Sequence, residues 1–104
     1  MLDGNTPLLA SAQKGRTEVV DMLLAAGARV DQVNRLGATA LNLACKNGHL
    51  ETAKILVAAD ADPTIKTRAG KDVLMEASDS DQADVVAWLS LTFPEGSNVM
   101  WRRL

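Results

Sequence analysis

Short apolar stretches with helical spacing recur along the chain and alternate with polar segments that contain glycine. One such stretch runs from about Thr17 to Ala26 and carries acidic residues, Glu18 and Asp21, on its other face. Its apolar residues follow the i, i+3, i+4 spacing of a single helix face: Val19, Val20, Leu23 and Leu24. The pattern predicts a short amphipathic helix with these residues buried.

The pattern returns at a spacing of 33 residues, which places Gly4, Gly37 and Gly70 in one register. Two leucine columns follow the same spacing: Leu8, Leu41 and Leu74, then Leu23, Leu56 and Leu89. The third copy is weaker, with Asp72 in the threonine column and Asp81 in place of a glycine. Helices this short are marginal alone in water and gain stability by stacking, for which about three repeats are usually needed. The sequence therefore predicts a stack of three helical repeats.

Signals for helix starts and stops lie between the apolar stretches. Thr6 is a typical N-cap residue, and Pro7 suits the first helical position because its missing N–H would have no partner there. We expect that helix to end before Gly15, since glycine just past a helix end tolerates positive φ. Asp60 stands in the second copy where the first has Gly27. Because aspartate adopts the left-handed conformation only at some cost, we expect a less stable helix stop there.

The segments that carry these signals resemble the ankyrin repeat. The resemblance covers about residues 3–93 and rests in the first two copies on these segments: 3–8, 15–20, 23–28, 37–41, 48–51 and 58–62. It departs from the family pattern at Ala40, Asn42 and Asp60, which replace a proline, a histidine and a glycine. The resemblance implies an all-α solenoid of stacked helix-turn-helix units with β-turn or hairpin fingers. We expect one domain over 1–94, with repeats at about 3–35, 36–68 and 69–93, and a tail, 95–104, that folds back or is disordered.

Composition and charge are those of an ordinary globular domain. Apolar residues make up 47% of the chain, charged residues 23%, and the net charge is −2. Bulk charge therefore does not indicate nucleic acid or a membrane as partner. No apolar run approaches the roughly 20 residues that span a bilayer. The segment from Met1 to Pro7 has no basic group before an apolar stretch, so it does not resemble a signal peptide. We expect an intracellular protein, in the cytoplasm with the nucleus as the alternative.

The chain carries little that could support catalysis. Cys45 is its only cysteine and His49 its only histidine, so neither an internal disulfide nor a zinc site can form from cysteine. Cys45 shares its column with the small residues Ala12 and Ser78, which predicts a buried and inert thiol. The family resemblance implies a structural, hydrogen-bonding role for His49. We therefore expect no enzyme activity, cofactor or metal.

In the family that the chain resembles, partners usually contact the turn tips and the exposed side of the first helices. Carried onto this sequence, those positions supply the binding candidates: Lys14, Arg35, Leu36, Lys46, Asn47, Lys66, Arg68 and Lys71. The charged candidates are basic, whereas the second helices carry the acidic residues Glu18, Asp21, Glu51 and Asp84. The pattern predicts a basic concave face and an acidic back.

The sequence thus favours a non-catalytic protein-interaction module, as an adaptor, scaffold or regulatory piece that binds an acidic protein surface. Nucleic-acid binding through the same face is an alternative, weakened by the net charge of −2 and by the lack of aromatic residues among the basic positions. A scaffold fragment without activity of its own is another. We expect a monomer, with no membrane association.

Overall fold

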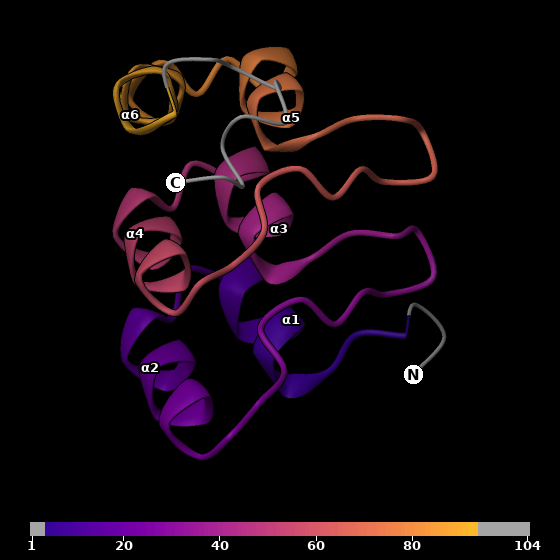
Figure 1. The fold of residues 1–104 in the computed structure, drawn as a ribbon, viewed down its shortest axis with the longest axis vertical. Helices are drawn as coiled ribbons and strands as arrows, with labels where there is room; N and C mark the ends of the chain where they lie inside the picture. Colours follow the sequence, from indigo (N-terminus) through magenta and orange to yellow (C-terminus); the bar gives the residue numbers. More distant parts are fainter. Residues whose placement is uncertain (1–3, 94–104) are drawn as a thin grey trace.

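The computed structural model of the chain describes residues 4–93. Within that range the chain forms six α-helices and no β-strand: α1 (Pro7–Gln13), α2 (Thr17–Ala25), α3 (Ala40–Lys46), α4 (Leu50–Ala58), α5 (Val73–Asp79) and α6 (Ala83–Thr92). Figure 1 shows them stacked in pairs, with α1, α3 and α5 in one column and α2, α4 and α6 in the other. The predicted all-α solenoid is confirmed.

Residue-level boundaries of the repeats, at about 3–35, 36–68 and 69–93, stay predictions. The tail at 95–104, with Trp101, lies outside the described residues.

The helices of the first column, α1, α3 and α5, are the inner helices, and each begins at a side chain that caps it. The Thr6 hydroxyl oxygen accepts a hydrogen bond from the Leu9 N–H at 3.2 Å, and Pro7 follows at the first helical position. Thr39 caps α3 in the same way at 3.1 Å, and the Asp72 carboxylate caps α5 at 3.0 Å. The predicted Thr6 cap is confirmed, and Asp72 performs in the third copy the capping role that threonine performs in the others.

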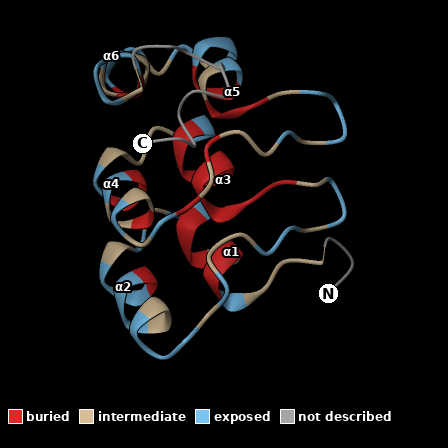
Figure 2. Cartoon of the chain, viewed as in Figure 1, coloured by how far each residue is buried: buried red, intermediate tan, exposed pale blue. Residues whose placement is uncertain are grey.

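The core lies between successive layers of the stack. Every residue of α3 from Ala40 to Cys45 is buried, because α3 is packed between α1 and α5. Figure 2 shows buried residues along α1 and α3 and mostly exposed or partly exposed residues along α2.

The helices of the other column, α2, α4 and α6, are the outer helices, and α2 buries fewer of its apolar residues than the sequence pattern predicts. On α2, Val20 is fully buried, but Val19 is 40% exposed and Leu23 and Leu24 are only partly buried. The expectation that all four share one buried face is therefore wrong for Val19. Nothing among residues 4–93 covers the outer side of α2, so the helix is buried only where it packs against α1 and α4.

Adjacent layers are joined by side chains that reach one layer back. His49 Nε2 lies 3.1 Å from the Gln13 carbonyl oxygen and must donate to it, since a carbonyl only accepts. One repeat later, Gln82 Nε2 donates to the Lys46 carbonyl at 3.3 Å. A Cβ on Gly15 would come within 2.5 Å of the His49 ring, so the joint requires glycine there. The structural role expected for His49 is confirmed.

Aspartate replaces glycine at two left-handed positions. Asp60 has φ of 74° and Asp81 has φ of 57°, where the preceding copies have Gly27 at 95° and Gly48 at 76°. The chain therefore keeps the same backbone path although the third copy and the end of the second lack the residue that adopts it most easily.

Candidate functional site

Two long loops project from the inner column and form fingers: the second finger, 27–39, and the third finger, 60–72. Each is closed by a backbone hydrogen bond, from Asn34 N–H to the Ala38 carbonyl at 3.1 Å and from Thr67 N–H to the Lys71 carbonyl at 3.0 Å. The Arg68 N–H donates to a carbonyl of the second finger at 2.9 Å. The two fingers are therefore held side by side.

The aliphatic part of an arginine side chain packs beside a glycine of the preceding repeat in two places. A Cβ on Gly4 would lie 3.1 Å from Arg35 Cγ, and one on Gly37 would lie 3.5 Å from Arg68 Cγ and 3.1 Å from its amide nitrogen. Both arginine residues are nevertheless exposed. The glycine register thus fixes the backbone and the first part of each arginine side chain at the finger surface.

A groove of about 450 Å³ lies between the two fingers and the inner helices. Its lining comes from the second finger, α3, the third finger and α5: Leu36, Ala38, Leu43, Lys46, Thr67, Arg68, Ala69, Lys71 and Glu76. Half of the predicted binding candidates meet here, namely Leu36, Lys46, Arg68 and Lys71. The other half, Lys14, Arg35, Asn47 and Lys66, is exposed but does not line the groove.

The apolar part of the groove is unevenly exposed. Leu43 and Ala38 are buried at 8% and 4% exposure and form its base, whereas Leu36 on the second finger is 66% exposed. A leucine this exposed beside a concave apolar surface is a natural contact for a partner side chain.

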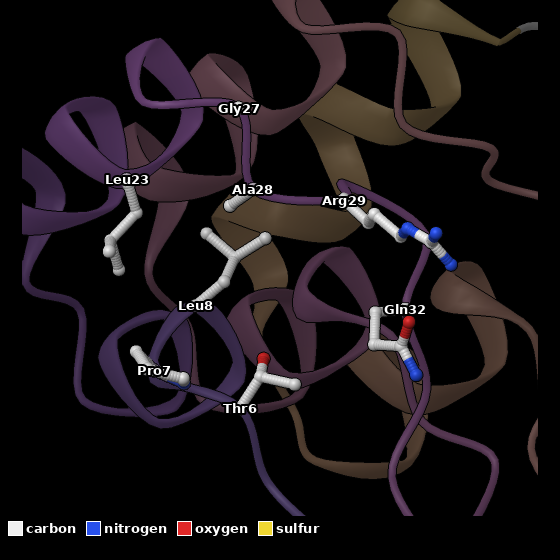
Figure 3. Close-up of a pocket in the computed structure, with 8 residues that line it drawn as sticks. All are labelled: Thr6, Pro7, Leu8, Leu23, Gly27, Ala28, Arg29 and Gln32. Carbon is white, nitrogen blue, oxygen red and sulfur yellow. The ribbon is translucent and has the colours of Figure 1, made fainter.

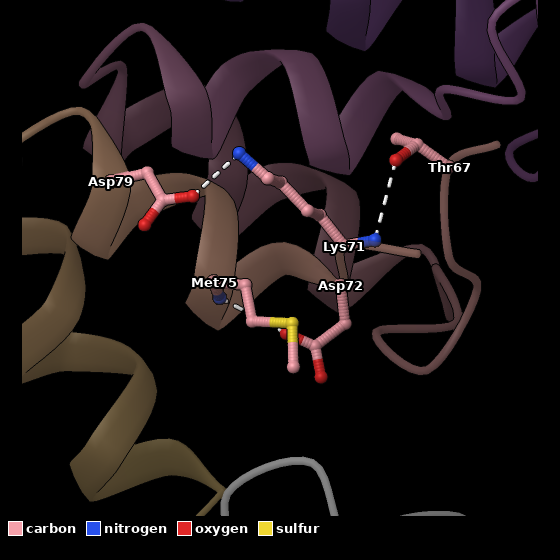
Figure 4. Close-up of polar contacts among 5 residues, drawn as sticks. All are labelled: Thr67, Lys71, Asp72, Met75 and Asp79. Atoms are coloured by element: carbon pink, nitrogen blue, oxygen red, sulfur yellow. Dashed lines mark hydrogen bonds and ion pairs between the residues drawn. The ribbon is translucent and has the colours of Figure 1, made fainter. Parts of the chain in front are cut away.

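The charge of Lys71 is already paired within the molecule. Its Nζ lies 2.6 Å from Asp79 Oδ2, an ion pair that joins the third finger to the end of α5 (Figure 4). The hydrogen bond and the negative charge of Asp79 raise the pKa of Lys71, with a smaller contribution from Glu76, against a lowering by desolvation. Among residues 4–93, Lys46 and Arg68 have no ion-pair partner. They are the groove cations left to contact a ligand.

Asn47 also uses its side chain locally. Its Nδ2 donates to the Leu43 carbonyl at 2.9 Å, at the end of α3. This bond ties the amide to the helix terminus, where the Leu43 carbonyl also accepts from the Asn47 backbone N–H at 3.1 Å.

Glu76 is the groove residue that the sequence-based prediction missed. It lies on α5 with 9% exposure, and the residues 33 and 66 positions earlier are Leu43 and Ala10. The signal was therefore present as an acidic residue in an apolar column. Glu76 makes the charges of the groove mixed, with a carboxylate beside two unpaired cations.

A second hollow, of about 370 Å³, lies on the open face of the first layer (Figure 3). Leu8, Leu23 and Ala28 supply its apolar lining and Arg29 its only charge. The residues 33 positions later are buried, because the first layer covers them: Leu41, Leu56 and Ala61. The hollow is therefore the stacking face of the first layer.

The buried thiol of Cys45 lies outside both hollows. Desolvation by burial raises its pKa to about 12, so the thiol stays protonated near neutral pH and is a poor nucleophile. In the part of the chain that the structure describes, no helix has the length and apolar character to cross a bilayer.

The chain is similar in sequence to proteins of one known family. A family model for ankyrin repeats matches residues 8–99 in three copies. The ankyrin repeat and KH domain-containing protein mask-1 of Caenorhabditis elegans is 35% identical over 99 residues, which cover 94% of this chain and 4% of that protein. The mouse ankyrin repeat domain-containing protein 63 is 34% identical over 94 residues, which cover 86% of this chain and 24% of that protein.

An Arabidopsis thaliana relative, the E3 ubiquitin-protein ligase XBAT33, is 45% identical over 53 residues, which cover 51% of this chain and 10% of that protein. The chain thus spans a quarter or less of each of these relatives. Repeats of this kind generally serve as non-catalytic protein–protein interaction modules that present extended concave surfaces. Because the family model matches residues 8–99 and the helices stack in pairs, the chain belongs to the ankyrin repeat family.

Proposed function

We propose that the chain is a non-catalytic module, adaptor or scaffold in type, that binds a partner protein through the groove between the second and third fingers. The observation that carries the proposal is the meeting of exposed Leu36 with Lys46 and Arg68, two cations without an ion-pair partner among residues 4–93. Because these residues come from separate elements, their proximity depends on the stack.

The groove combines the two features that recognition surfaces use. Burial of Leu36 and coverage of Leu43 would supply apolar contact, from which most binding free energy derives. Lys46 and Arg68 would steer the encounter and fix the orientation of the partner. Lys14, Arg35, Asn47 and Lys66 remain candidate contacts at the margin of the same face.

Nucleic acid is the less favoured ligand for this surface. Its affinity comes chiefly from cations that contact phosphates, and here Asp79 already pairs with Lys71 while Glu76 adds a negative charge to the lining. The groove lining contains no aromatic side chain on which a base could stack.

The proposal is tested by immobilising the chain and capturing partners from lysate, with and without nuclease. A double variant, Lys46→Glu with Arg68→Glu, reverses both unpaired groove charges. Lys54→Glu is the matched control, because Lys54 is a cation on the outer helix α4, away from the groove. Circular dichroism of each variant confirms that the helices are kept.

We expect a discrete protein to bind the natural chain and the Lys54→Glu control but not the double variant, and nuclease to have no effect. Loss of capture on nuclease treatment would favour nucleic acid instead. Equal capture by the natural chain and the double variant would exclude the groove as the binding site.

A further inference from the structure

We propose that the groove recognises a mixed-charge peptide segment, in which an aliphatic side chain contacts Leu36 and Leu43, a basic side chain pairs with Glu76, and an acidic side chain pairs with Arg68 and Lys46. This inference rests on the proposed function and specifies the partner chemistry for the same site.

Glu76 is the acidic residue of the groove lining, and a basic group on the ligand would neutralise its charge. Its side chain is 9% exposed and lines the groove, and within residues 4–93 it has neither an ion-pair nor a side-chain hydrogen-bond partner. Its cationic neighbour Lys71 is committed to Asp79 at 2.6 Å. The negative charge of Glu76 acts on Lys71 only as a minor contribution beside Asp79, so a cation that enters the groove can form the direct ion pair that Glu76 lacks.

The stack itself gives no reason for an acid at this position. The equivalent inner-helix residues are Ala10 and Leu43, both apolar, and Leu43 is buried there at 8% exposure. The cap of α5 is supplied by Asp72 and not by Glu76. Neither capping nor the packing of the stack therefore accounts for an acid at position 76, where the side chain lines the groove.

The opposite charge comes from two other elements that line the groove, the third finger and α3. The Arg68 backbone is held by its hydrogen bond to the Leu36 carbonyl at 2.9 Å, and its stem packs against the position of Gly37. Lys46 ends α3, where a cation also complements the helix dipole, yet its exposed side chain still lines the groove. Leu36 and Leu43 supply apolar surface to the same groove.

This arrangement selects against partners of a single charge sign. A segment with acidic residues alone would place like charge against Glu76, and one with basic residues alone would place it against Arg68 and Lys46. A segment that carries both signs close to an aliphatic residue complements Glu76, Arg68 and Lys46 together.

The test selects binders from a random-sequence peptide display library on the intact chain. We expect enriched peptides to share an acidic and a basic residue close to an aliphatic one. One enriched peptide is then synthesised and titrated against the natural chain, Glu76→Gln, Glu76→Leu, Arg68→Gln and, as the matched control, Lys54→Gln. The Glu76→Leu variant introduces the residue of the preceding copy, Leu43, so we expect it to keep the fold.

We expect each groove variant to weaken binding about tenfold, as the loss of one charge-assisted contact does, and Lys54→Gln to leave the affinity unchanged. Neutralising the basic residue of the peptide should weaken binding to the natural chain but not to Glu76→Gln. Enrichment of acidic peptides that bind Glu76→Gln as well or better would overturn the mixed-charge inference and leave the proposed function standing. Failure to enrich any peptide that depends on Arg68 would count against both.

Discussion

Asn42 is a buried polar side chain without a hydrogen-bond partner. It is 1% exposed, and neither its Nδ2 nor its Oδ1 has a partner among the described residues. Its backbone N–H is satisfied by the Thr39 cap. The first copy has Leu9, also fully buried, in the same column. An unsatisfied buried amide costs roughly 1–3 kcal/mol, so this residue weakens a stack that would tolerate an apolar one.

We therefore predict that Asn42→Leu raises the free energy of unfolding by about 1 kcal/mol, measured by urea denaturation. The matched control is the reverse change in the first layer, Leu9→Asn, which should lower it. If Asn42→Leu destabilises the chain as Leu9→Asn does, the asparagine has a partner that stabilises it and the interpretation is wrong.

Gly27 and Asp60 both have positive φ just past the end of an outer helix, so the cost of that conformation can be compared between glycine and aspartate. Gly27 has φ of 95°, and a Cβ there would meet nothing within 4 Å. Gly27→Ala should therefore lower the free energy of unfolding by about 1 kcal/mol through backbone strain alone. Asp60→Gly, at the same column of the second copy, should raise the unfolding midpoint, because Asp60 already has φ of 74°. Thermal denaturation of both variants checks the two signs, and an unchanged midpoint for both would mean that neither stop is strained.

At the scale of elements, the joints between layers repeat in geometry but not in chemistry. His49 and Gln82 occupy equivalent positions and contact equivalent carbonyls, of Gln13 and Lys46. A ring nitrogen and a side-chain amide thus perform the same task one repeat apart. The joint therefore depends on a side-chain N–H donor of sufficient reach and not on an imidazole in particular.

His49→Gln should consequently fold with nearly unchanged stability, whereas His49→Ala should lose about 1 kcal/mol, the net value of one hydrogen bond. Urea denaturation of the two variants side by side gives the comparison. Equal losses for glutamine and alanine would show that packing of the imidazole ring, and not its hydrogen bond, holds the layers together.

How much could be read from the sequence differs between local and long-range features. The Thr6 cap, the helix limits near Gly15 and the left-handed Asp60 follow from chemistry within a few residues, and all were predictable. The exposure of Val19 was not predictable, because it depends on which side of α2 packs against α1 and α4. Glu76 could have been found as a charge in an apolar column.

At the scale of the whole molecule, the charges of the candidate face are rearranged by the fold. The basic residues of the fingers and first helices can be grouped from the sequence, but the Lys71–Asp79 pair depends on a third finger that reaches the far end of α5. Lys71 and Asp79 lie at opposite ends of α5, so their pairing requires the folded helix. The pair removes Lys71 from the free cations, and Glu76 offsets another. A face that the sequence predicts as basic is thus a groove of mixed charge around an apolar base.

Photo-crosslinking shows whether a protein binds the chain in this groove. A photo-crosslinking amino acid is placed at position 36, where the natural leucine is 66% exposed in the groove, and in a separate protein at position 54 on α4. After irradiation in lysate, we expect a discrete protein adduct from position 36 and none from position 54. An adduct from position 54 alone would place the binding surface on the outer helices and contradict the proposed function.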